Sequence, residues 1–147
     1  MDTNVIVIED CVETWEDAIQ RTAKELYNKG FVKEEFGEHC ILREKVFPTG
    51  LNTEIPIAIP HTESEFVNAS AICFLRLKKP VNFISMEDNE HEVPAQYVLN
   101  LAIKESKKQV PMLAKVIETF QDTKFLKELA TKELPEFEVL LRSRLAK

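Results

Sequence analysis

Hydrophobic and polar residues in the first third of the chain follow a pattern that predicts one short strand and then two helices. Val5–Ile8 is a short apolar run and favours an edge strand. Thr14, with Asp17 three residues later, has the pattern of a helix N-cap, and Gly30 suits the residue just past the end of that helix. A second helix is predicted over Lys33–Arg43. The inward-facing residues of the two helices are expected to be Trp15, Ile19, Thr22, Leu26, Val32, Phe36 and Cys40.

The middle of the chain has the pattern of a sheet. Ala71–Leu77 and Tyr97–Ile103 are almost entirely apolar, which is typical of central strands covered on both faces. Lys78–Pro80 is predicted to turn the chain, and Val81–Phe83 alternates like a strand with one solvent-exposed face. Ile55–Ile59 is a further apolar run, and its branched side chains favour a buried strand.

The hydrophobic period becomes helical in the last third of the chain. One apolar stripe runs along Val110–Phe120, Asp122 is expected to cap a further helix, and Pro135 is expected to begin the last one. This order of helices, strands and further helices is typical of a layered α/β domain. We therefore expect residues 1–147 to form a single α/β domain, in which a mixed β-sheet is flanked by helices on both faces.

Composition and charge narrow the class of partner. The net charge is -6, and nucleic acid and anionic membranes both bind clustered Lys and Arg, so neither is expected as a partner. The apolar runs are too short to cross a membrane, and the N-terminus lacks the basic-then-apolar order of a signal peptide. Cys11, Cys40 and Cys73 are odd in number and lack a paired spacing, which favours reduced thiols. The sequence thus predicts an acidic cytoplasmic protein with no direct membrane insertion.

The three histidines are the main candidates for chemistry. The isolated glycines form no phosphate-binding loop, no serine has a nucleophile-elbow pattern, and no Cys or His pair has metal-ligand spacing, so neither cofactor nor metal is expected. His39 lies on the second predicted helix, where a partly buried structural residue is the simpler interpretation. His91 lies in the acidic segment Met86–Glu92, where a metal site would lack a rigid frame. His61 directly follows Pro60 and is the strongest candidate.

His61 is expected at the exit of a rigid strand, because Pro60 has no amide hydrogen and should end the pairing. A neutral imidazole is a good nucleophile near physiological pH, and its phosphoramidate can pass the phosphoryl group onward. Arg43 is the candidate for stabilising phosphate charge, because a guanidinium matches phosphate oxygens. Two alternatives stay open: an ordinary surface histidine at a strand end, and a helix-end arginine that favours the C-terminal dipole.

A combination of three short segments carries a family resemblance. These segments are Arg43-Glu44-Lys45, Pro48-Thr49-Gly50-Leu51 and Ile57-Ala58-Ile59-Pro60-His61. Together they resemble the EIIA components of the fructose/mannitol class, which belong to the phosphoenolpyruvate-dependent sugar phosphotransferase system. Within that class the second and third segments are most similar to the galactitol-type EIIA proteins. The similarity continues through Arg76–Phe83 and Leu101–Ile103, and it extends from about Glu13 to Leu140.

The resemblance implies a phosphotransferase that carries phosphate in sugar transport. His61 would accept a phosphoryl group from HPr and pass it to a cysteine of a cognate EIIB, which serves the membrane component EIIC. Arg43 would steady the phosphate charge and orient the imidazole. Many relatives have a second histidine where this chain has Gln109, whose amide could still donate a hydrogen bond to phosphate. Thr49 and the backbone amides around His61 are weaker candidates for the same role.

The phosphoryl donor HPr and the acceptor EIIB should bind in turn to one mostly apolar surface around His61. Each complex should be weak, with a Kd on the order of 10 μM or weaker. Lys107 and Lys108 are hypothesised to steer a phosphorylated partner, the alternative being a solvated helix start. The competing function is regulatory: an EIIA-like protein whose phosphorylation state controls a partner without sugar transport. A third interpretation, a binding module in which His61 has lost its function, is disfavoured by the presence of Arg43.

Overall fold

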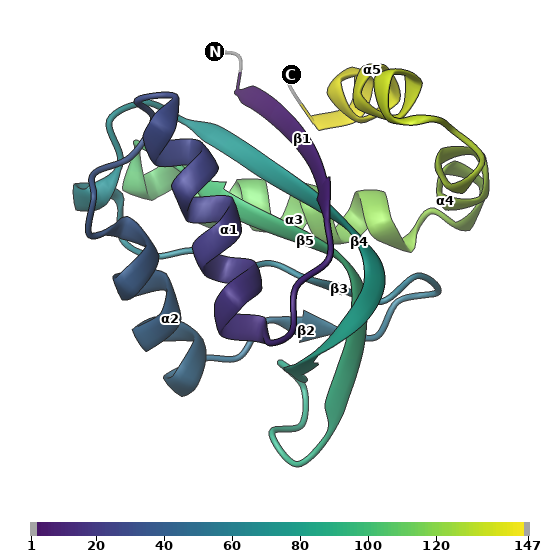
Figure 1. The fold of residues 1–147 in the computed structure, drawn as a ribbon, viewed down its shortest axis with the longest axis horizontal. Coiled ribbons are helices and arrows are strands. Elements are labelled where there is room, and N and C mark those ends of the chain that lie inside the picture. The colour runs from purple at the N-terminus through teal and green to yellow at the C-terminus, as the bar shows by residue number, and fades with distance from the viewer. Residues whose placement is uncertain (1–2, 146–147) are drawn as a thin grey trace.

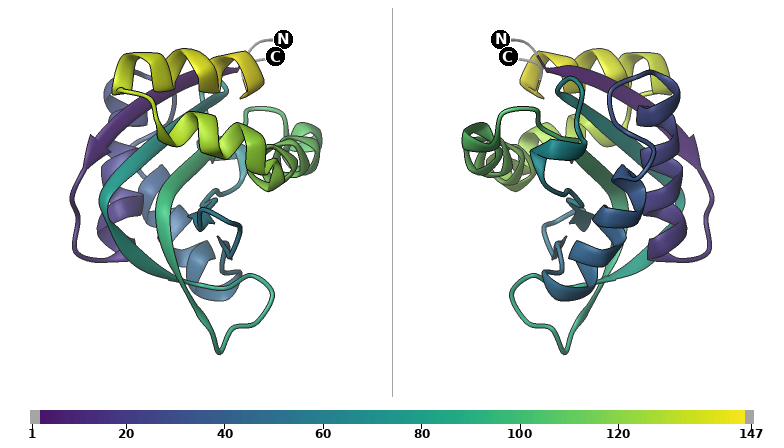
Figure 2. Two further views of the ribbon diagram at one scale, coloured as in Figure 1. Left: turned by 90° about the vertical axis from the view of Figure 1, so that its right-hand side faces the viewer. Right: turned by 90° about the vertical axis from the view of Figure 1, so that its left-hand side faces the viewer.

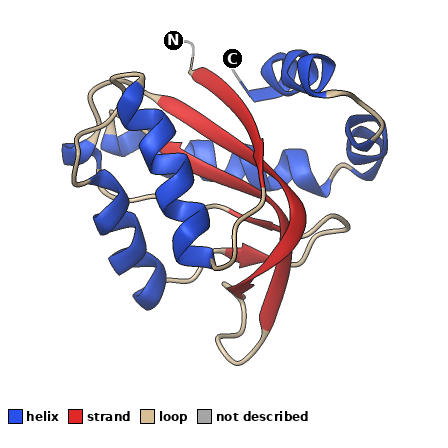
Figure 3. Cartoon of the chain, in the orientation of Figure 1, coloured by secondary structure: helices blue, strands red, loops and turns tan. Residues whose placement is uncertain are grey.

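Five strands form one mixed sheet at the centre of the computed structural model, which describes residues 3–145 (Figure 1, Figure 3). The strands are β1 (Asn4–Asp10), β2 (Gly50–Leu51), β3 (Ile57–Ala58), β4 (Ala71–Ile84) and β5 (Glu92–Ala102). Their order across the sheet is β1-β4-β5-β3-β2. β1 is parallel to β4 and β3 is parallel to β5, whereas β4–β5 and β2–β3 are antiparallel. The predicted edge strand and the two predicted central strands are confirmed.

Helices cover both faces of this sheet, as Figure 2 shows from two sides. One face carries α1 (Trp15–Asn28) and α2 (Phe36–Val46). The other face carries α3 (Gln109–Gln121), α4 (Thr123–Ala130) and α5 (Leu134–Leu145). The predicted α/β fold, with a mixed sheet between two helical layers, is confirmed.

The local signals that begin and end the helices act as predicted. Thr14 Oγ1 accepts a hydrogen bond of 3.1 Å from the amide of Asp17, which caps α1. Gly30 follows the end of α1 with a φ of 83°, a left-handed conformation that glycine adopts at little cost. The carboxylate of Asp122 accepts from the amide of Phe125 at 3.1 Å and caps α4.

The second helix begins later than predicted. α2 covers Phe36–Val46 instead of Lys33–Arg43, because the backbone before it is engaged elsewhere. The Lys33 amide donates to the carbonyl oxygen of Phe66 at 2.9 Å, which ties this segment to the loop after β3. The helix also continues past Arg43, so this arginine lies in its last turn rather than at its final residue.

A turn predicted at Lys78–Pro80 is wrong, because β4 continues through this segment. Arg76 pairs with Tyr97, and Val81 pairs with Ala95. Between these two pairs β4 advances by five residues, whereas β5 advances by only two. The extra residues form an irregular bulge, which accommodates a proline that has no amide hydrogen to offer. β4 is therefore one long, bent strand (Figure 1).

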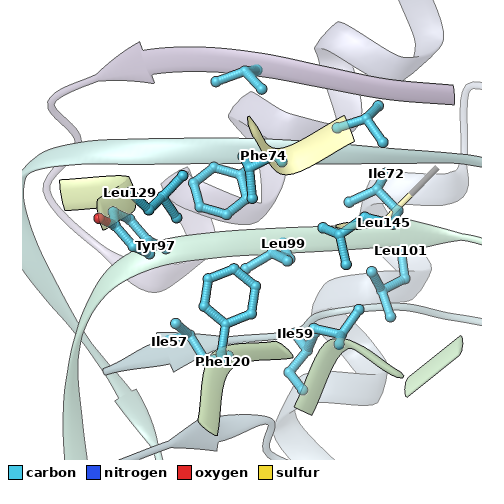
Figure 4. Packing of buried hydrophobic residues seen from close by; sticks show 14 of the residues in the cluster. Ile57, Ile59, Ile72, Phe74, Tyr97, Leu99, Leu101, Phe120, Leu129 and Leu145 are labelled. Carbon is cyan, nitrogen blue, oxygen red and sulfur yellow. The ribbon is translucent and has the colours of Figure 1, made fainter. Parts of the chain in front are cut away.

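The core beneath α3, α4 and α5 is rich in aromatic rings and anchors the segment that leads to His61. Neighbouring ring centroids lie 5.0 to 6.2 Å apart among Phe74, Tyr97, Phe120 and Phe137. Ile57 and Ile59 lie in the same fully buried cluster (Figure 4). Burying such a side chain contributes about 1.5 to 3 kcal/mol. This hydrophobic anchor makes the backbone before His61 a rigid support.

β3 is shorter than predicted, since only Ile57–Ala58 of the run Ile55–Ile59 belong to the regular ladder. The chain nevertheless stays beside β5. The Leu101 amide donates to the carbonyl oxygen of Pro60 at 3.0 Å, and His61 forms an isolated parallel bridge with Leu101. His61 is therefore held by backbone pairing near the C-terminal end of β5.

Candidate functional site

The ring of His61 is held by the backbone two residues before it. Its Nδ1 lies 2.9 Å from the carbonyl oxygen of Ile59. A carbonyl oxygen can only accept, so Nδ1 carries the proton of the neutral ring and donates it, which leaves the lone pair on Nε2. Because the Ile59 side chain is fully buried (Figure 4), the accepting carbonyl is firmly placed. Nε2 is therefore the nitrogen of this half-buried ring that carries the free lone pair.

The environment of His61 favours its neutral form. Burial lowers the pKa of the ring below 6.5, because a charged imidazolium loses solvation in the protein. The hydrogen bond to Ile59 opposes this shift, whereas the positive charge of Arg43 lowers the pKa further. A neutral ring keeps the lone pair that a nucleophile requires.

We expect the His61 ring to titrate with a midpoint below 6.5, measured by NMR on ¹⁵N-labelled protein. The native state then binds fewer protons than the unfolded chain, so His61 lowers the free energy of unfolding as the pH falls from 6.5 toward the native pKa. Over the same interval the ring stays nucleophilic. A midpoint for His61 at or above 6.5 would contradict this prediction.

Arg43 presents an unpaired donor close to this ring. The Nε of Arg43 is buried and has no hydrogen-bond partner among residues 3–145. The guanidinium carbon lies 5.1 Å from the centroid of the Phe47 ring, which restrains the side chain through a cation–π contact. A buried N–H without a partner is costly, on the order of 1 to 3 kcal/mol, unless an acceptor is supplied. The positive charge of Arg43 acts on the His61 ring, so it would also stabilise an anion bound at that ring.

Thr49 lies beneath the site and is buried. Its hydroxyl contacts the carboxylate of Glu44 at 2.9 and 3.1 Å and accepts from the amide of Ile59 at 3.0 Å. Its own amide donates to Glu44 at 2.7 Å. Thr49 therefore contacts the residue that holds the His61 ring, and a direct contact with phosphate stays a prediction.

Glu44 was not predicted as part of the site. Its carboxylate is buried at 6% exposure, and burial raises its pKa to about 7 even though Thr49 donates to it and Arg43 is nearby. A signal in the sequence could have revealed this position. Phe36, Cys40 and Glu44 follow one another at intervals of four residues, which places all three on the buried face of α2.

Gln109 lies at the first residue of α3 and contacts the loop that carries His61. Its Nε2 donates to the carbonyl oxygen of Thr62 at 3.1 Å. Lys107 and Lys108 are exposed in the short 3₁₀ segment just before α3. The structure thus brings three predicted residues, Arg43, Thr49 and Gln109, to the segment around His61, and their roles toward phosphate stay predictions.

The other two histidines each contact a neighbouring side chain away from His61. His39 stacks on the ring of Phe66 with centroids 4.0 Å apart. His91 lies in the loop between β4 and β5, with Nδ1 2.6 Å from the carboxylate of Asp88. Within residues 3–145, no three His, Cys, Asp or Glu side chains gather as ligands for a metal ion.

A protein-family comparison identifies the class of protein that this fold and site represent. The family described as "Phosphoenolpyruvate-dependent sugar phosphotransferase system, EIIA 2" matches residues 1–141. This match covers nearly the whole chain, so the chain belongs to that family and has a phosphoryl-carrier role in a sugar phosphotransferase system.

Two curated relatives are similar over different lengths. The galactitol-specific EIIA component of Escherichia coli K12 is 31% identical over 121 residues, which are 82% of this chain and 79% of that protein. The transcriptional regulator ManR of Bacillus subtilis is 35% identical over 65 residues, or 44% of this chain. The match spans only about a tenth of ManR (10%).

Solved structures of mannitol-specific EIIA proteins have the same fold. The IIA component in a complex of IIA-mannitol with phosphorylated IIB-mannitol from Escherichia coli superposes with a TM-score of 0.76 at 25% identity, covering 96% of this chain and 95% of that one. The crystal structure of IIA-mannitol from the same organism gives a TM-score of 0.74 at 25% identity, covering 94% and 95%. In the part of the chain that the structure describes, no helix has the length and apolar character to cross a bilayer.

Proposed function

We propose that this chain receives a phosphoryl group from phosphorylated HPr on Nε2 of His61 and passes it to the cysteine of a cognate EIIB. The observation that carries the proposal is the Nδ1 contact with the Ile59 carbonyl, which leaves the Nε2 lone pair available beside Arg43. We further propose that residues 1–147 act as one cytoplasmic phosphocarrier domain. The membrane component EIIC would be served only indirectly, through EIIB.

Each transfer would exchange one bond to phosphorus for another. In the first step the Nε2 lone pair forms the N–P bond while the bond to the donor histidine breaks, and the donor nitrogen keeps that electron pair. In the second step the thiolate of the EIIB cysteine forms an S–P bond, and Nε2 recovers its lone pair as the N–P bond breaks. Positioning and charge stabilisation suffice for such transfers. Arg43 would supply the charge, and the amide of Gln109 could donate a further hydrogen bond.

We propose that the partners dock over exposed apolar side chains on the two helix ends that carry Arg43 and Gln109. Exposed hydrophobic side chains lie in the last turns of α2 and just after it, and at the start of α3: Leu42, Val46, Phe47 and Val110. Arg43 and Gln109, which contact the site, lie on these same two helix ends. We infer that HPr and EIIB use this apolar surface in turn, and that Lys107 and Lys108 steer the phosphorylated donor toward it.

Val46→Asp is expected to raise the KM for phosphorylated HPr about 10-fold with little change in kcat, because a charge at an apolar interface costs roughly 1.4 kcal/mol or more. Val139→Asp is a matched control, since Val46 and Val139 are both 67% exposed and Val139 lies on α5. The measurement is the initial rate of phosphorylation as a function of HPr concentration. Equal KM values for the two variants would place the docking surface elsewhere.

Incubation with phosphoenolpyruvate, Enzyme I and HPr, followed by mapping of the phosphorylated residue, tests the proposed function. We expect one acid-labile phosphoryl group, on His61. Phosphate on another residue, or none, would refute the proposal. The sugar is a separate matter: the relatives are named for galactitol and mannitol, and we propose a sugar or polyol as the transported class.

A regulatory role is the second candidate, because part of the chain is similar to the transcriptional regulator ManR. In that case the phosphorylation state of His61 would control another protein. Transfer of the phosphoryl group from this chain to a purified cognate EIIB separates the two functions. A carrier transfers it to the EIIB cysteine, whereas a purely regulatory domain does not.

A further inference from the structure

A continuous set of hydrogen bonds connects a buried carboxylate to the ring of His61. Glu44 accepts from the amide and hydroxyl of Thr49, the Thr49 hydroxyl accepts from the Ile59 amide, and the Ile59 carbonyl accepts from His61 Nδ1. We propose that Glu44 is a positioning residue, which acts through Thr49 and the backbone of Ile59 to hold the His61 ring with Nε2 ready to react. The catalytic importance of this role rests on the function proposed above.

The burial of Glu44 is costly, which argues for a role other than stability. Its pKa of about 7 means that the native state releases this proton less readily than the unfolded chain, so ionisation of Glu44 lowers the stability as the pH rises from 4.5 toward 7. Charged and titratable groups around it are Arg43 and Cys40 on the same helix, and Lys45, which lines the same pocket of about 380 Å³. An exposed glutamate on α2 would avoid this cost. The hydrogen bonds to Thr49 are what the buried position provides.

Ile59 is the point at which this set of bonds reaches the site. The pair Gly50–Ala58 is the last in the β2–β3 ladder, and one step further along the same register Thr49 faces Ile59. There the regular ladder has ended, and the Ile59 amide donates a hydrogen bond to the Thr49 hydroxyl instead. The Ile59 carbonyl, two bonds further along the backbone, points to His61 Nδ1. The orientation of the Ile59 peptide therefore sets the position of the acceptor for His61 Nδ1.

The carboxylate determines which way the Thr49 hydroxyl points. A threonine hydroxyl has one proton and two lone pairs, and its proton rotates to suit its neighbours. Glu44 attracts that proton, so a lone pair of Oγ1 is directed at the Ile59 amide. Without Glu44, the buried Thr49 amide would also lose its acceptor. A neutral glutamine can accept both hydrogen bonds through its carbonyl oxygen, so the geometry, and not the charge, is the requirement.

Paired variants at both positions test this inference. Glu44→Met and Thr49→Val remove the hydrogen bonds at similar volume, whereas Glu44→Gln and Thr49→Ser retain them. Glu38→Gln is the control, because Glu38 is exposed on the same helix. Two properties are measured on folded protein, with the thermal midpoint recorded for each variant. They are the ring ¹⁵N chemical shifts of His61 without any donor, and the single-turnover phosphorylation rate from HPr.

Glu44→Met and Thr49→Val are expected to slow phosphoryl transfer about 10-fold or more at unchanged KM, because a small misplacement of the nucleophile is costly. Both should shift the His61 ring signals toward a mixture of tautomers. Glu44→Gln, Thr49→Ser and Glu38→Gln should match the parent protein in both properties. Parent-like ring signals in folded Glu44→Met or Thr49→Val would overturn the inference. The ring signals require no phosphoryl donor, so they test it even if His61 proves not to be phosphorylated.

Discussion

His61→Ala is expected to abolish phosphorylation by HPr while leaving the fold intact. The substitution removes the Nε2 nucleophile, and we expect no other histidine to replace it. The structural cost is small, because the half-buried ring contributes one hydrogen bond to Ile59, worth about 1 kcal/mol. Far-UV circular dichroism should match the parent protein. Acid-labile phosphoprotein, formed with phosphoenolpyruvate, Enzyme I and HPr, should fall to background.

His91→Ala is the matched control for this experiment. His91 is exposed in the loop between β4 and β5 and contacts Asp88, so its loss should change neither fold nor phosphorylation. If His61→Ala still accumulates phosphoprotein at the parental rate, His61 is not the acceptor. The paired result also separates a specific loss from a general effect of removing a histidine.

Much of the fold could be predicted because the signals were local. The caps at Thr14 and Asp122 and the left-handed Gly30 depend on residues within a few positions of each other. The errors arose where distant contacts decide. Lys33 bonds to the loop after β3 instead of beginning a helix, and Lys78–Pro80 continues a strand because β5 pairs on both sides of the bulge.

The candidate site was predictable in its residue types and less so in its geometry. The prediction that Pro60 ends the pairing is wrong, because the β3 ladder ends at Ala58 and a bridge to Leu101 follows at His61. Arg43 follows from the chemistry that phosphate requires. The bond from Nδ1 to Ile59 fixes the tautomer, and no sequence pattern specifies it. The burial of Glu44 could have been read from its four-residue spacing to Phe36 and Cys40, although a glutamate is ordinarily expected on the solvent face. The two features are linked through Thr49, which directly precedes β2 and contacts both Glu44 and Ile59.

Arg43→Gln is expected to slow phosphoryl transfer to His61 about 100-fold, on the order of 3 kcal/mol in the barrier. The reason is the positive charge of Arg43, which acts on the His61 ring and would also stabilise a phosphoryl group transferred to that ring. Charge that spreads over the phosphoryl oxygens in the transition state is stabilised most by a donor already in place. The effect should therefore appear in kcat, with KM for HPr little changed, in single-turnover measurements at saturating donor.

A second measurement on the same variant reports the proximity of the two residues independently of transfer. The positive charge of Arg43 lowers the pKa of His61, so Arg43→Gln should raise the midpoint of the ring titration. Arg43→Lys keeps the charge but loses the planar donor fork, so it should preserve the midpoint while recovering only part of the rate. A near-parental rate for Arg43→Gln would show that phosphate is stabilised by other groups. An unchanged midpoint in that variant would show that the guanidinium lies too far from the ring to act on it.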